Sequence, residues 1–371
     1  MKKNRQCRII LSGGGTGGHI FPAIAIANEL RVLDPSVEIL FVGATGKMEM
    51  DKVPRAGYKI IGLPVSAFHR GLSFKNLLFP FRLLASMFKA ARIIRKFNPD
   101  LVIGTGGFAS GPVLRVAARK NIPTVIQEQN SFPGVTNRLL GHKVGRICVA
   151  YPGMDQYFPG DRIVLTGNPV RSDLPIPEGC KSEAQAIFDI RGNQPVILIF
   201  GGSQGARTIN RSVYAHIDKL ADAPVDFIWQ TGTAFFNTAT ETIKSLHATN
   251  IRAIEFIHEM KFAYALADLV VCRSGAITLS ELSLLGKPAI LVPLPSAAED
   301  HQSKNARTYV DAGAAILVSD AEAPDHLVDG MLQLVADQKL LASMSSHMIR
   351  FAKPNAVHEI AAEALNLIPD T

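Results

Sequence analysis

Cysteine is scarce in this sequence, and the four cysteines lie far apart. Cys7, Cys148, Cys180 and Cys272 form no C-x-x-C pair, which argues against a disulfide framework and against a cysteine-bound zinc site. The pattern is typical of buried, reduced thiols in a cytosolic protein. Long apolar stretches are missing too: no run of about 20 uncharged apolar residues occurs, and we therefore expect no membrane-spanning helix.

Two common signatures of phosphate chemistry are also absent. No G-K-[ST] sequence occurs in the 371 residues, which argues against ATP hydrolysis by a P-loop. Neither half of the chain contains a D-x-D carboxylate pair that would share a metal ion with substrate phosphates. We therefore expect chemistry without a metal ion or another cofactor.

Acidic residues are missing from one stretch of the sequence. Ten lysines and arginines but no aspartate or glutamate occur between Lys52 and Pro99. The formal net charge is +7, so this segment carries the whole excess and the rest of the chain sums to −3. Charge concentrated in this way indicates a local anionic partner rather than a generally cationic surface.

Short apolar runs alternate with helix-length amphipathic stretches along the chain. Many runs are apolar throughout, as strands buried on both faces of a parallel sheet are, and the alternation predicts a doubly wound α/β fold. The expected strands are Cys7–Ser12, Val37–Val42, Asp100–Ile103, Thr124–Gln127, Gly145–Ala150, Pro195–Phe200, Val225–Gln230, Ile251–Phe256, Asp268–Cys272 and Ala289–Pro293.

A break rich in proline and glycine, Gly167–Gly192, divides this pattern in two. Each half opens with a strand, a glycine loop and a helix, as RIILSGGGTGGH in the first and VILIFGGSQGAR in the second. We predict two Rossmann-like domains, residues 1–167 and 168–354, that face each other across a cleft. A final helix at about 355–371 is expected to pack on one domain or the other.

The first glycine loop, Gly13–Gly18, formally matches the dinucleotide pattern G-x-G-x-x-G. That pattern needs a carboxylate for the ribose at the end of the second strand, and Val42–Gly46 contains none. The loop is therefore predicted to bind another phosphorylated ligand through backbone N–H groups. His19 comes directly after the glycines, where an imidazole either takes a proton from a reacting hydroxyl or is only a capping or structural group.

A second glycine loop, Gly104–Pro112, follows another expected strand of the same half. The carboxyl ends of parallel strands share one edge of a sheet, so both loops should lie in one crevice. Two such loops indicate a ligand with a diphosphate. The alternative is that these glycines serve only tight strand-to-helix turns.

The second half carries a different group of polar residues. Its turn Arg273–Gly275 precedes a helix near Ala276, whose free N–H groups suit a diphosphate. Glu281 lies in that otherwise apolar or small helix, where it would accept hydrogen bonds from a ribose or, alternatively, be a solvated or capping glutamate. The polar residues of Glu299–Asn305 suit sugar hydroxyls or a simple helix cap.

These segments together resemble one enzyme family. GGTGGHIFPA, GTGGFASGP, EQN, GNPVR, GGSQGAR, CRSGAITLSE and HQSKNA occur in the order seen in the MurG family of N-acetylglucosaminyltransferases, which convert lipid I to lipid II in peptidoglycan synthesis. The resemblance implies the GT-B fold and an inverting reaction. It also implies peripheral association with the cytoplasmic face of the bacterial inner membrane.

The resemblance assigns the acceptor and the membrane to the first domain, and the UDP-sugar donor to the second. The donor's N-acetylglucosamine would contact Thr16, Gly17, Gly18 and Asn130. Its other contacts would be Arg171, Ser203, Ile257 (at the uracil), Ala276, Ile277, Thr278, Leu279, Ser280, Glu281 (at the ribose) and Gln302. The acceptor diphosphate would be held by Gly14, Gly15, Gly106 and Gly107.

Two catalytic candidates follow from the same comparison. His19 resembles the proposed base of the family, and Glu128 of the EQN motif is a second polar candidate. His301 departs from the family pattern, because some members carry a glutamine at this position.

Residues 70–97 combine apolar and basic side chains at near-helical spacing. The apolar set is Phe74, Leu77, Leu78, Phe81, Leu84, Phe88 and Ile94, and the basic set is Lys75, Arg82, Lys89, Arg92, Arg95 and Lys96. Such a segment suits a helix on an anionic bilayer or an ordinary core helix with a basic solvent face. The lipid-linked acceptor implied by the resemblance favours the membrane. No nucleic-acid-binding motif accompanies the charge, so we expect no nucleic-acid partner.

The resemblance implies that the C4 hydroxyl of the muramoyl sugar of lipid I displaces UDP from UDP-N-acetylglucosamine with inversion. The main alternative is a UDP-sugar 2-epimerase or another GT-B enzyme. A non-catalytic membrane-bound sensor of nucleotide sugars is a second alternative. A third, an NAD-dependent dehydrogenase, is disfavoured by the missing ribose carboxylate.

Overall fold

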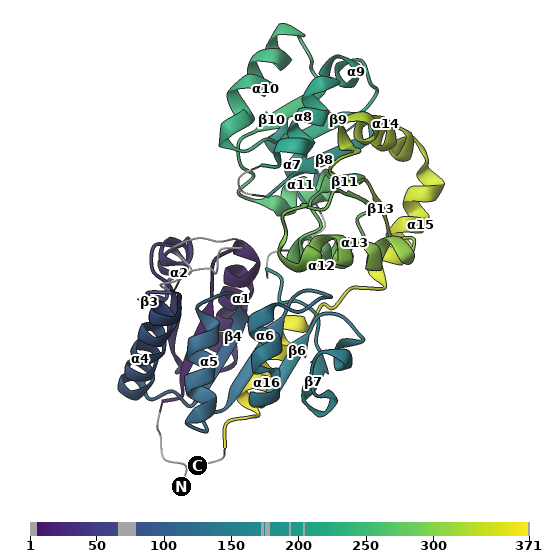
Figure 1. Cartoon of the computed structure of the whole chain (residues 1–371). Coiled ribbons are helices and arrows are strands. Elements are labelled where there is room, and N and C mark those ends of the chain that lie inside the picture. Colours follow the sequence, from purple (N-terminus) through teal and green to yellow (C-terminus); the bar gives the residue numbers. More distant parts are fainter. Residues whose placement is uncertain are drawn as a thin grey trace. The chain divides into compact units, whose positions relative to one another are not determined.

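The computed structural model describes residues 6–65, 79–171, 174, 179–192, 194–202 and 205–369. The chain divides into two compact units (Figure 1). The first unit comprises Met1–Arg171 together with Lys353–Thr371, and the second comprises Ser172–Ala352. Each unit is built on its own parallel sheet, which confirms the predicted α/β class with two Rossmann-like domains.

The first unit has a sheet of seven described parallel strands in the order β3-β2-β1-β4-β5-β6-β7. These are β1 (Arg8–Gly13), β2 (Glu38–Ala44), β3 (Lys59–Leu63), β4 (Leu101–Gly106), β5 (Thr124–Glu128), β6 (Arg146–Val149) and β7 (Ile163–Leu165). Its described helices are α1 (Gly17–Leu33), α2 (Glu49–Arg55), α4 (Phe79–Phe97), α5 (Ser110–Arg119), α6 (Val135–Leu140) and α16 (Ala356–Leu365). The strand order reverses between the neighbours β1 and β4, and ligands of such sheets bind at the carboxyl ends of the strands at this point.

The second unit has six described parallel strands in the order β10-β9-β8-β11-β12-β13. These are β8 (Val196–Phe200), β9 (Asp226–Gln230), β10 (Ile251–Ile254), β11 (Leu269–Cys272), β12 (Ala289–Leu291) and β13 (Ala315–Leu317). Its described helices are α7 (Cys180–Phe188), α8 (Arg207–Ala215), α9 (Ile217–Ala221), α10 (Thr233–Ser245), α11 (Met260–Leu266), α12 (Ala276–Leu285), α13 (His301–Asp311), α14 (Ala323–Ala336) and α15 (Gln338–Ile349). Here the order reverses between β8 and β11.

Successive side chains of β1 pack into different cores, as the alternation of a strand requires. Ile10 joins the cluster that includes α5, whereas Ile9 and Leu11 join the one that includes α1 and α16. Ile360 of α16 is fully buried in this second cluster. The final helix therefore packs on the first unit beside α1, a choice that the sequence left open (Figure 1).

Three strands of the structure were not expected from the sequence. They are β3, β7 and β13, and each is the last strand at one edge of its sheet. β7 and β13 are three residues long, and β3 alternates exposed and partly buried residues. Edge strands lack the continuous apolar run by which central parallel strands are recognised.

The burial of two cysteines gives a test of these cores. Cys148 and Cys272 are buried, whereas Cys7 and Cys180 are partly exposed. Burial raises the pKa of the Cys148 thiol to about 12 and also raises that of Cys272, so neither forms appreciable thiolate at pH 8. We expect iodoacetamide at pH 8 to label only Cys7 and Cys180 in the native protein and all four after denaturation, as measured by peptide mass spectrometry. Rapid native labelling of Cys148 would contradict the packing described here.

Candidate active site

The first glycine loop joins β1 to α1 and is held from inside by a buried carboxylate. Glu49, at the start of α2, has no exposed surface. Its Oε2 accepts a hydrogen bond from the Gly15 backbone N–H at 3.1 Å, and its Oε1 accepts one from Ala44 N–H at 2.9 Å. A side chain at Gly14 would collide with the same carboxylate. The shape of the loop therefore depends on Glu49.

The sequence pattern did not reveal Glu49, because the dinucleotide pattern requires its carboxylate at the end of the second strand and Val42–Gly46 contains none. It lies only five residues beyond Ala44, the last residue of β2. Instead of pointing toward a ribose, it accepts a hydrogen bond from an amide of the protein's own glycine loop. The Gly15 N–H, expected to contact the acceptor diphosphate, thus already has an anionic partner.

The second glycine loop follows β4 and touches the first one. Gly106 and Gly107 have positive φ values of 99° and 83°. A side chain at Gly107 would collide with the Gly14 carbonyl oxygen, and a Cβ at Gly106 would lie 2.9 Å from the His19 ring. The structure therefore brings Gly14, Gly106, Gly107 and His19 together. These glycines allow contact between the loops in addition to turning the chain.

His19 lies in the first turn of α1, with its ring half-buried against the end of β4. Its Nδ1 lies 2.9 Å from the Thr105 carbonyl oxygen and 3.1 Å from Oε1 of Gln129. Thr105 also donates its hydroxyl to the His19 carbonyl at 2.7 Å. Two acceptor oxygens at Nδ1 favour a proton on that nitrogen, which makes Nε2 the basic nitrogen of the neutral ring.

The N-terminus of α1 contains Thr16, Gly17 and Gly18. The Thr16 carbonyl oxygen accepts hydrogen bonds from the backbone N–H groups of His19 and Ile20, at 3.1 and 3.2 Å. Thr16 and Gly18 are exposed and Gly17 is partly exposed. The first turn of this helix therefore presents backbone groups to solvent, next to the His19 ring.

Glu128 is buried, with 1% of its surface exposed. Its Oε1 accepts from the backbone and side-chain amides of Asn130 at 3.0 and 3.3 Å. Its Oε2 accepts from Gly134 N–H at 3.1 Å and from the Asn137 side chain at 2.8 Å. With four donors around it, this carboxylate organises the loop that carries Asn130.

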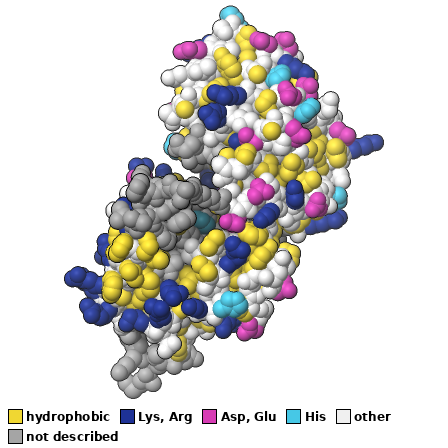
Figure 2. All heavy atoms as spheres, in the orientation of Figure 1, with side chains coloured by type: hydrophobic (Ala, Val, Ile, Leu, Met, Phe, Trp, Pro, Cys, Tyr) yellow, Lys and Arg dark blue, Asp and Glu magenta, His cyan; other side chains and the backbone are white. Residues whose placement is uncertain are grey.

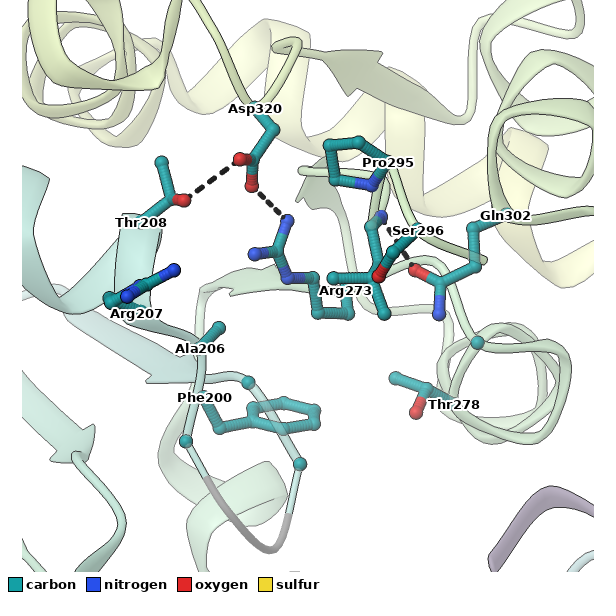
Figure 3. A pocket seen from close by; sticks show the side chains of 15 residues that line it. Phe200, Ala206, Arg207, Thr208, Arg273, Thr278, Pro295, Ser296, Gln302 and Asp320 are labelled. Carbon is teal, nitrogen blue, oxygen red and sulfur yellow. Dashed lines mark hydrogen bonds and ion pairs between the residues drawn. The ribbon is translucent and has the colours of Figure 1, made fainter. Parts of the chain in front are cut away.

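The second unit contains a pocket of about 510 Å³ at the carboxyl ends of its central strands (Figure 3). It lies where the strand order reverses, between the loop after β8 and the turn after β11. The pocket is lined by Phe200, Gly201, Gly202, Gly205, Ala206, Arg207, Thr208, Arg273, Gly275, Thr278, Leu294, Pro295, Ser296, Gln302 and Asp320. Of the predicted donor contacts it brings together Thr278 and Gln302. Ser203 lies outside the described residues.

An ion pair shapes one wall of this pocket. Arg273 pairs with Asp320 and also donates to the carbonyl oxygens of Val292 and Pro293, each at 3.0 Å. Thr208 donates its hydroxyl to the other carboxylate oxygen of Asp320 at 2.8 Å (Figure 3). Neither Asp320 nor Thr208 could be recognised from the sequence. Asp320 lies 47 residues from Arg273 and 112 residues from Thr208 along the chain.

α12 begins at Ala276, directly after the turn. Ala276 and Leu279 are buried, whereas Ile277, Thr278 and Ser280 are partly exposed. Amides in the first turn of this helix have no partner inside the helix itself. The positive end of its dipole therefore lies beside the pocket.

Glu281 is buried, with 6% of its surface exposed, and accepts a hydrogen bond from the Tyr264 hydroxyl at 2.9 Å. The alternative of a solvated glutamate is therefore wrong.

Gln230 holds a second part of the site: its Oε1 accepts from Ile257 N–H at 2.8 Å and its Nε2 donates to the Gly202 carbonyl at 3.0 Å. One buried amide thus ties the glycine loop to the Ile257 segment.

Gln302 and His301 begin α13. The Gln302 Oε1 accepts from Leu294 N–H at 2.9 Å, and its carbonyl oxygen accepts from the Ser274 hydroxyl at 2.8 Å. The Nδ1 of His301 lies within hydrogen-bonding distance of the Ala298 carbonyl oxygen, at 2.6 Å.

The remaining predicted donor contact, Arg171, is exposed and is the last residue of the first segment of the first unit.

Comparison with known proteins identifies the family to which these two units belong. The glycosyltransferase family 28 N-terminal domain matches residues 9–149, and the C-terminal domain of the same family matches residues 196–360. The relatives include the UDP-N-acetylglucosamine–N-acetylmuramyl-(pentapeptide) pyrophosphoryl-undecaprenol N-acetylglucosamine transferase of Parabacteroides distasonis, 49% identical over 98% of this chain and 99% of the relative. The enzyme of the same name from Cytophaga hutchinsonii is 46% identical over 99% of each chain. The chain belongs to the MurG family.

Solved structures agree with this assignment. Acinetobacter baumannii MurG has a TM-score of 0.77 and 27% identity, with 97% of this chain and 99% of that chain covered. A UDP-GlcNAc 2-epimerase from Neisseria meningitidis shares the fold, with a TM-score of 0.66, but only 17% identity over 98% of this chain and 100% of that chain. Fold alone does not separate the two activities. The sequence relationship to the MurG family does, and it confirms the predicted glycosyltransferase rather than the epimerase.

The role of Glu49 can be tested by removing its charge without changing its shape. Glu49→Gln leaves one of the Gly15 and Ala44 N–H groups facing an NH₂ group, and an unsatisfied buried donor costs about 1–3 kcal/mol. We expect the free energy of unfolding to fall by that amount in urea titrations. Asp51→Asn, on the exposed side of α2, is the matched control and should change it by less than about 0.5 kcal/mol. Equal stability of the two variants would rule out the proposed support of the loop.

Proposed function

We propose that this chain transfers N-acetylglucosamine from UDP-GlcNAc to the C4 hydroxyl of the MurNAc residue of lipid I. The product is lipid II, and the reaction belongs to peptidoglycan synthesis and cell-wall formation. The observation that carries the proposal is the 46% and 49% identity, over 99% and 98% of this chain, with transferases named for this reaction. The geometry of both units supports it.

In the proposed donor site the second unit binds the nucleotide. The N-terminus of α12 and the loop after β8 would receive the diphosphate, because free N–H groups and the helix dipole favour anions. Buried Glu281, oriented by Tyr264, would accept hydrogen bonds from the ribose. Ile257 would contact the uracil. The remaining proposed donor contacts are Ala276, Ile277, Thr278, Leu279, Ser280, Ser203, Arg171 and Gln302, with Thr16, Gly17, Gly18 and Asn130 at the sugar.

In the proposed acceptor site the first unit holds lipid I. Gly14, Gly106 and Gly107 would lie against its diphosphate. Gly15 would contribute through loop shape, because its N–H already donates to Glu49. Glu128 would act through Asn130, the residue whose two amides it accepts.

The proposed reaction is a single displacement at the anomeric carbon. The C4 oxygen of MurNAc forms the new bond to C1 of the sugar as the bond from C1 to the UDP oxygen breaks, with inversion. Nε2 of His19 takes the hydroxyl proton, and UDP leaves with its charge stabilised by the N–H groups at the start of α12. No metal ion or other cofactor takes part in this proposal.

The membrane-facing part of the proposal concerns α4. Phe81, Leu84 and Phe88 are 69%, 54% and 77% exposed, whereas Ile93 and Ile94 on the same helix are buried in the core. Figure 2 shows an apolar patch over this helix with lysine and arginine side chains around it. We propose that this surface binds anionic lipid at the cytoplasmic face of the inner membrane. Residues 70–78 of the predicted basic segment lie outside the described residues.

Within the part of the chain that the structure describes, no helix has the length and apolar character needed to cross a membrane.

The proposed catalytic and ribose contacts predict different kinetic defects. His19→Gln removes the base, and we expect kcat for transfer to a lipid I analogue to fall about 10²-fold to 10⁴-fold. Glu281→Gln removes a charged acceptor, so the KM for UDP-GlcNAc should rise about tenfold or more. His326→Gln, on the exposed face of α14, is the control and should match wild type. Transfer at the wild-type rate by His19→Gln would show that His19 is not the base.

The membrane proposal predicts a defect that spares soluble-substrate chemistry. Lys89→Glu combined with Arg92→Glu removes two basic residues, each worth about 1 kcal/mol at an anionic surface. Binding to phosphatidylglycerol vesicles in a sedimentation assay should weaken by at least about 30-fold, while turnover of a short-chain lipid I analogue should be retained. Lys339→Glu combined with Arg350→Glu, at two exposed residues of the second unit, gives the same change in net charge and is the control. If both proteins bind vesicles alike, α4 is not the membrane surface.

A further inference from the structure

Three buried amide side chains form a hydrogen-bonded network beside His19. Gln127, Gln129 and Asn168 are 0%, 2% and 3% exposed. Gln127 donates to the Asn168 side-chain oxygen at 3.0 Å, and Asn168 donates to the backbone carbonyl oxygen of Gln129 at 3.1 Å. Gln129 in turn donates to the side-chain oxygen of Gln127. Gln127 therefore bonds to both other side chains, Asn168 also bonds to the backbone of Gln129, and buried networks satisfied in this way are rigid.

The orientation of the Gln129 amide follows from its surroundings. Its Nε2 has three acceptors: the Thr105 carbonyl at 2.7 Å, the Gln127 carbonyl at 3.2 Å, and the Gln127 side-chain oxygen. The opposite orientation would place the Gln129 oxygen against three oxygens, with no proton between them. The amide oxygen therefore faces Nδ1 of His19, at 3.1 Å.

This arrangement determines which nitrogen of His19 is basic. Nδ1 lies between two acceptors, the Gln129 amide oxygen and the Thr105 carbonyl oxygen. Neither oxygen can supply a proton, so Nδ1 carries one and the lone pair of the neutral ring is at Nε2. When Nε2 gains a proton, the charge of the imidazolium is stabilised by both oxygens.

We propose that Gln129 is a positioning residue for the transfer reaction, acting through His19. It holds the imidazole in the Nδ1–H tautomer, with Nε2 as the proton acceptor, and stabilises the imidazolium that forms as the C4 hydroxyl loses its proton. The inference rests on the proposed role of His19 as the base. A carboxylate could not replace this amide, because position 129 must donate to Thr105 and Gln127 as well as accept from His19.

The sign of the expected pH effect follows from the lost acceptor. Gln129→Met keeps a long side chain but removes the oxygen at Nδ1, which makes the imidazolium less favourable and lowers the pKa of His19. The rate requires neutral His19, so the acid limb of the kcat profile should move to lower pH. We expect a shift of about half a unit to one unit, and a kcat about tenfold lower at its plateau. The KM for UDP-GlcNAc should be unchanged.

Asn168→Ala provides the matched control. It removes the hydrogen bonds of Asn168 to Gln127 and to the Gln129 backbone and should lower stability, but it leaves the Gln129 side chain with its Thr105 and Gln127 acceptors and its oxygen facing His19. Its acid limb should coincide with that of wild type. An unshifted limb in Gln129→Met, or equal shifts in both variants, would show that the network serves only folding.

The tautomer itself can be measured without turnover. Protein labelled with ¹⁵N-histidine, compared with His19→Gln to identify the resonance, should show His19 protonated at Nδ1 at neutral pH. A dominant Nε2–H form in wild type would overturn the role of Gln129 and leave the base assignment to the kinetic test. Full activity in His19→Gln would instead overturn His19 as the base, and with it the role of Gln129, whatever the tautomer. No transfer by the wild-type protein to a lipid I analogue would overturn the proposed function itself.

Discussion

The site in the first unit depends on close backbone contact between two loops, which only glycine permits. A side chain at Gly107 would strike the Gly14 carbonyl, and one at Gly106 would press on the His19 ring. Both residues have positive φ, a conformation that other residues adopt only at a cost. Because the loops touch, the first turn of α1 comes within hydrogen-bonding distance of the end of β4. The orientation of His19 is a consequence of that contact.

In the second unit the loops at the strand ends are held by side-chain contacts as well as by a close backbone contact at a glycine. A side chain at Gly205 would collide with the Thr231 carbonyl, so this loop also packs closely on a neighbouring strand end. Its connection to the Ile257 segment, however, is the side-chain amide of Gln230. The opposite wall is held by the pairing of Arg273 with Asp320. The loops at the strand ends are therefore held by different contacts in the two units. The first unit is proposed to bind the acceptor and the second the donor.

Sequence reasoning succeeded where the signal is local. Glycine loops after apolar strands, and the histidine next to one of them, are visible in a few consecutive residues. The failures involve partners far apart in the chain: Glu49 with Gly15, Gln129 with His19, and Asp320 with Arg273, separated by 34, 110 and 47 residues. No periodicity or spacing relates such pairs, because the sheet topology brings them together. Edge strands were missed for a related reason, since partial exposure removes the apolar run that marks a buried strand.

The carboxylates among these long-range partners each have a hydrogen-bond donor or a cation beside them. Both proposed substrates carry a diphosphate, and a carboxylate facing either one would repel it. Glu49 and Glu128 are instead surrounded by N–H donors, and Asp320 is paired with Arg273. Glu281, which accepts from Tyr264, is the acid proposed to meet hydroxyls rather than phosphate. In a reaction proposed to need no metal ion, pairing these carboxylates with donors leaves backbone N–H groups and helix N-termini to attract the diphosphates. Because these acids are already matched by N–H donors or by Arg273, their charges oppose a bound diphosphate less than unpaired carboxylates would.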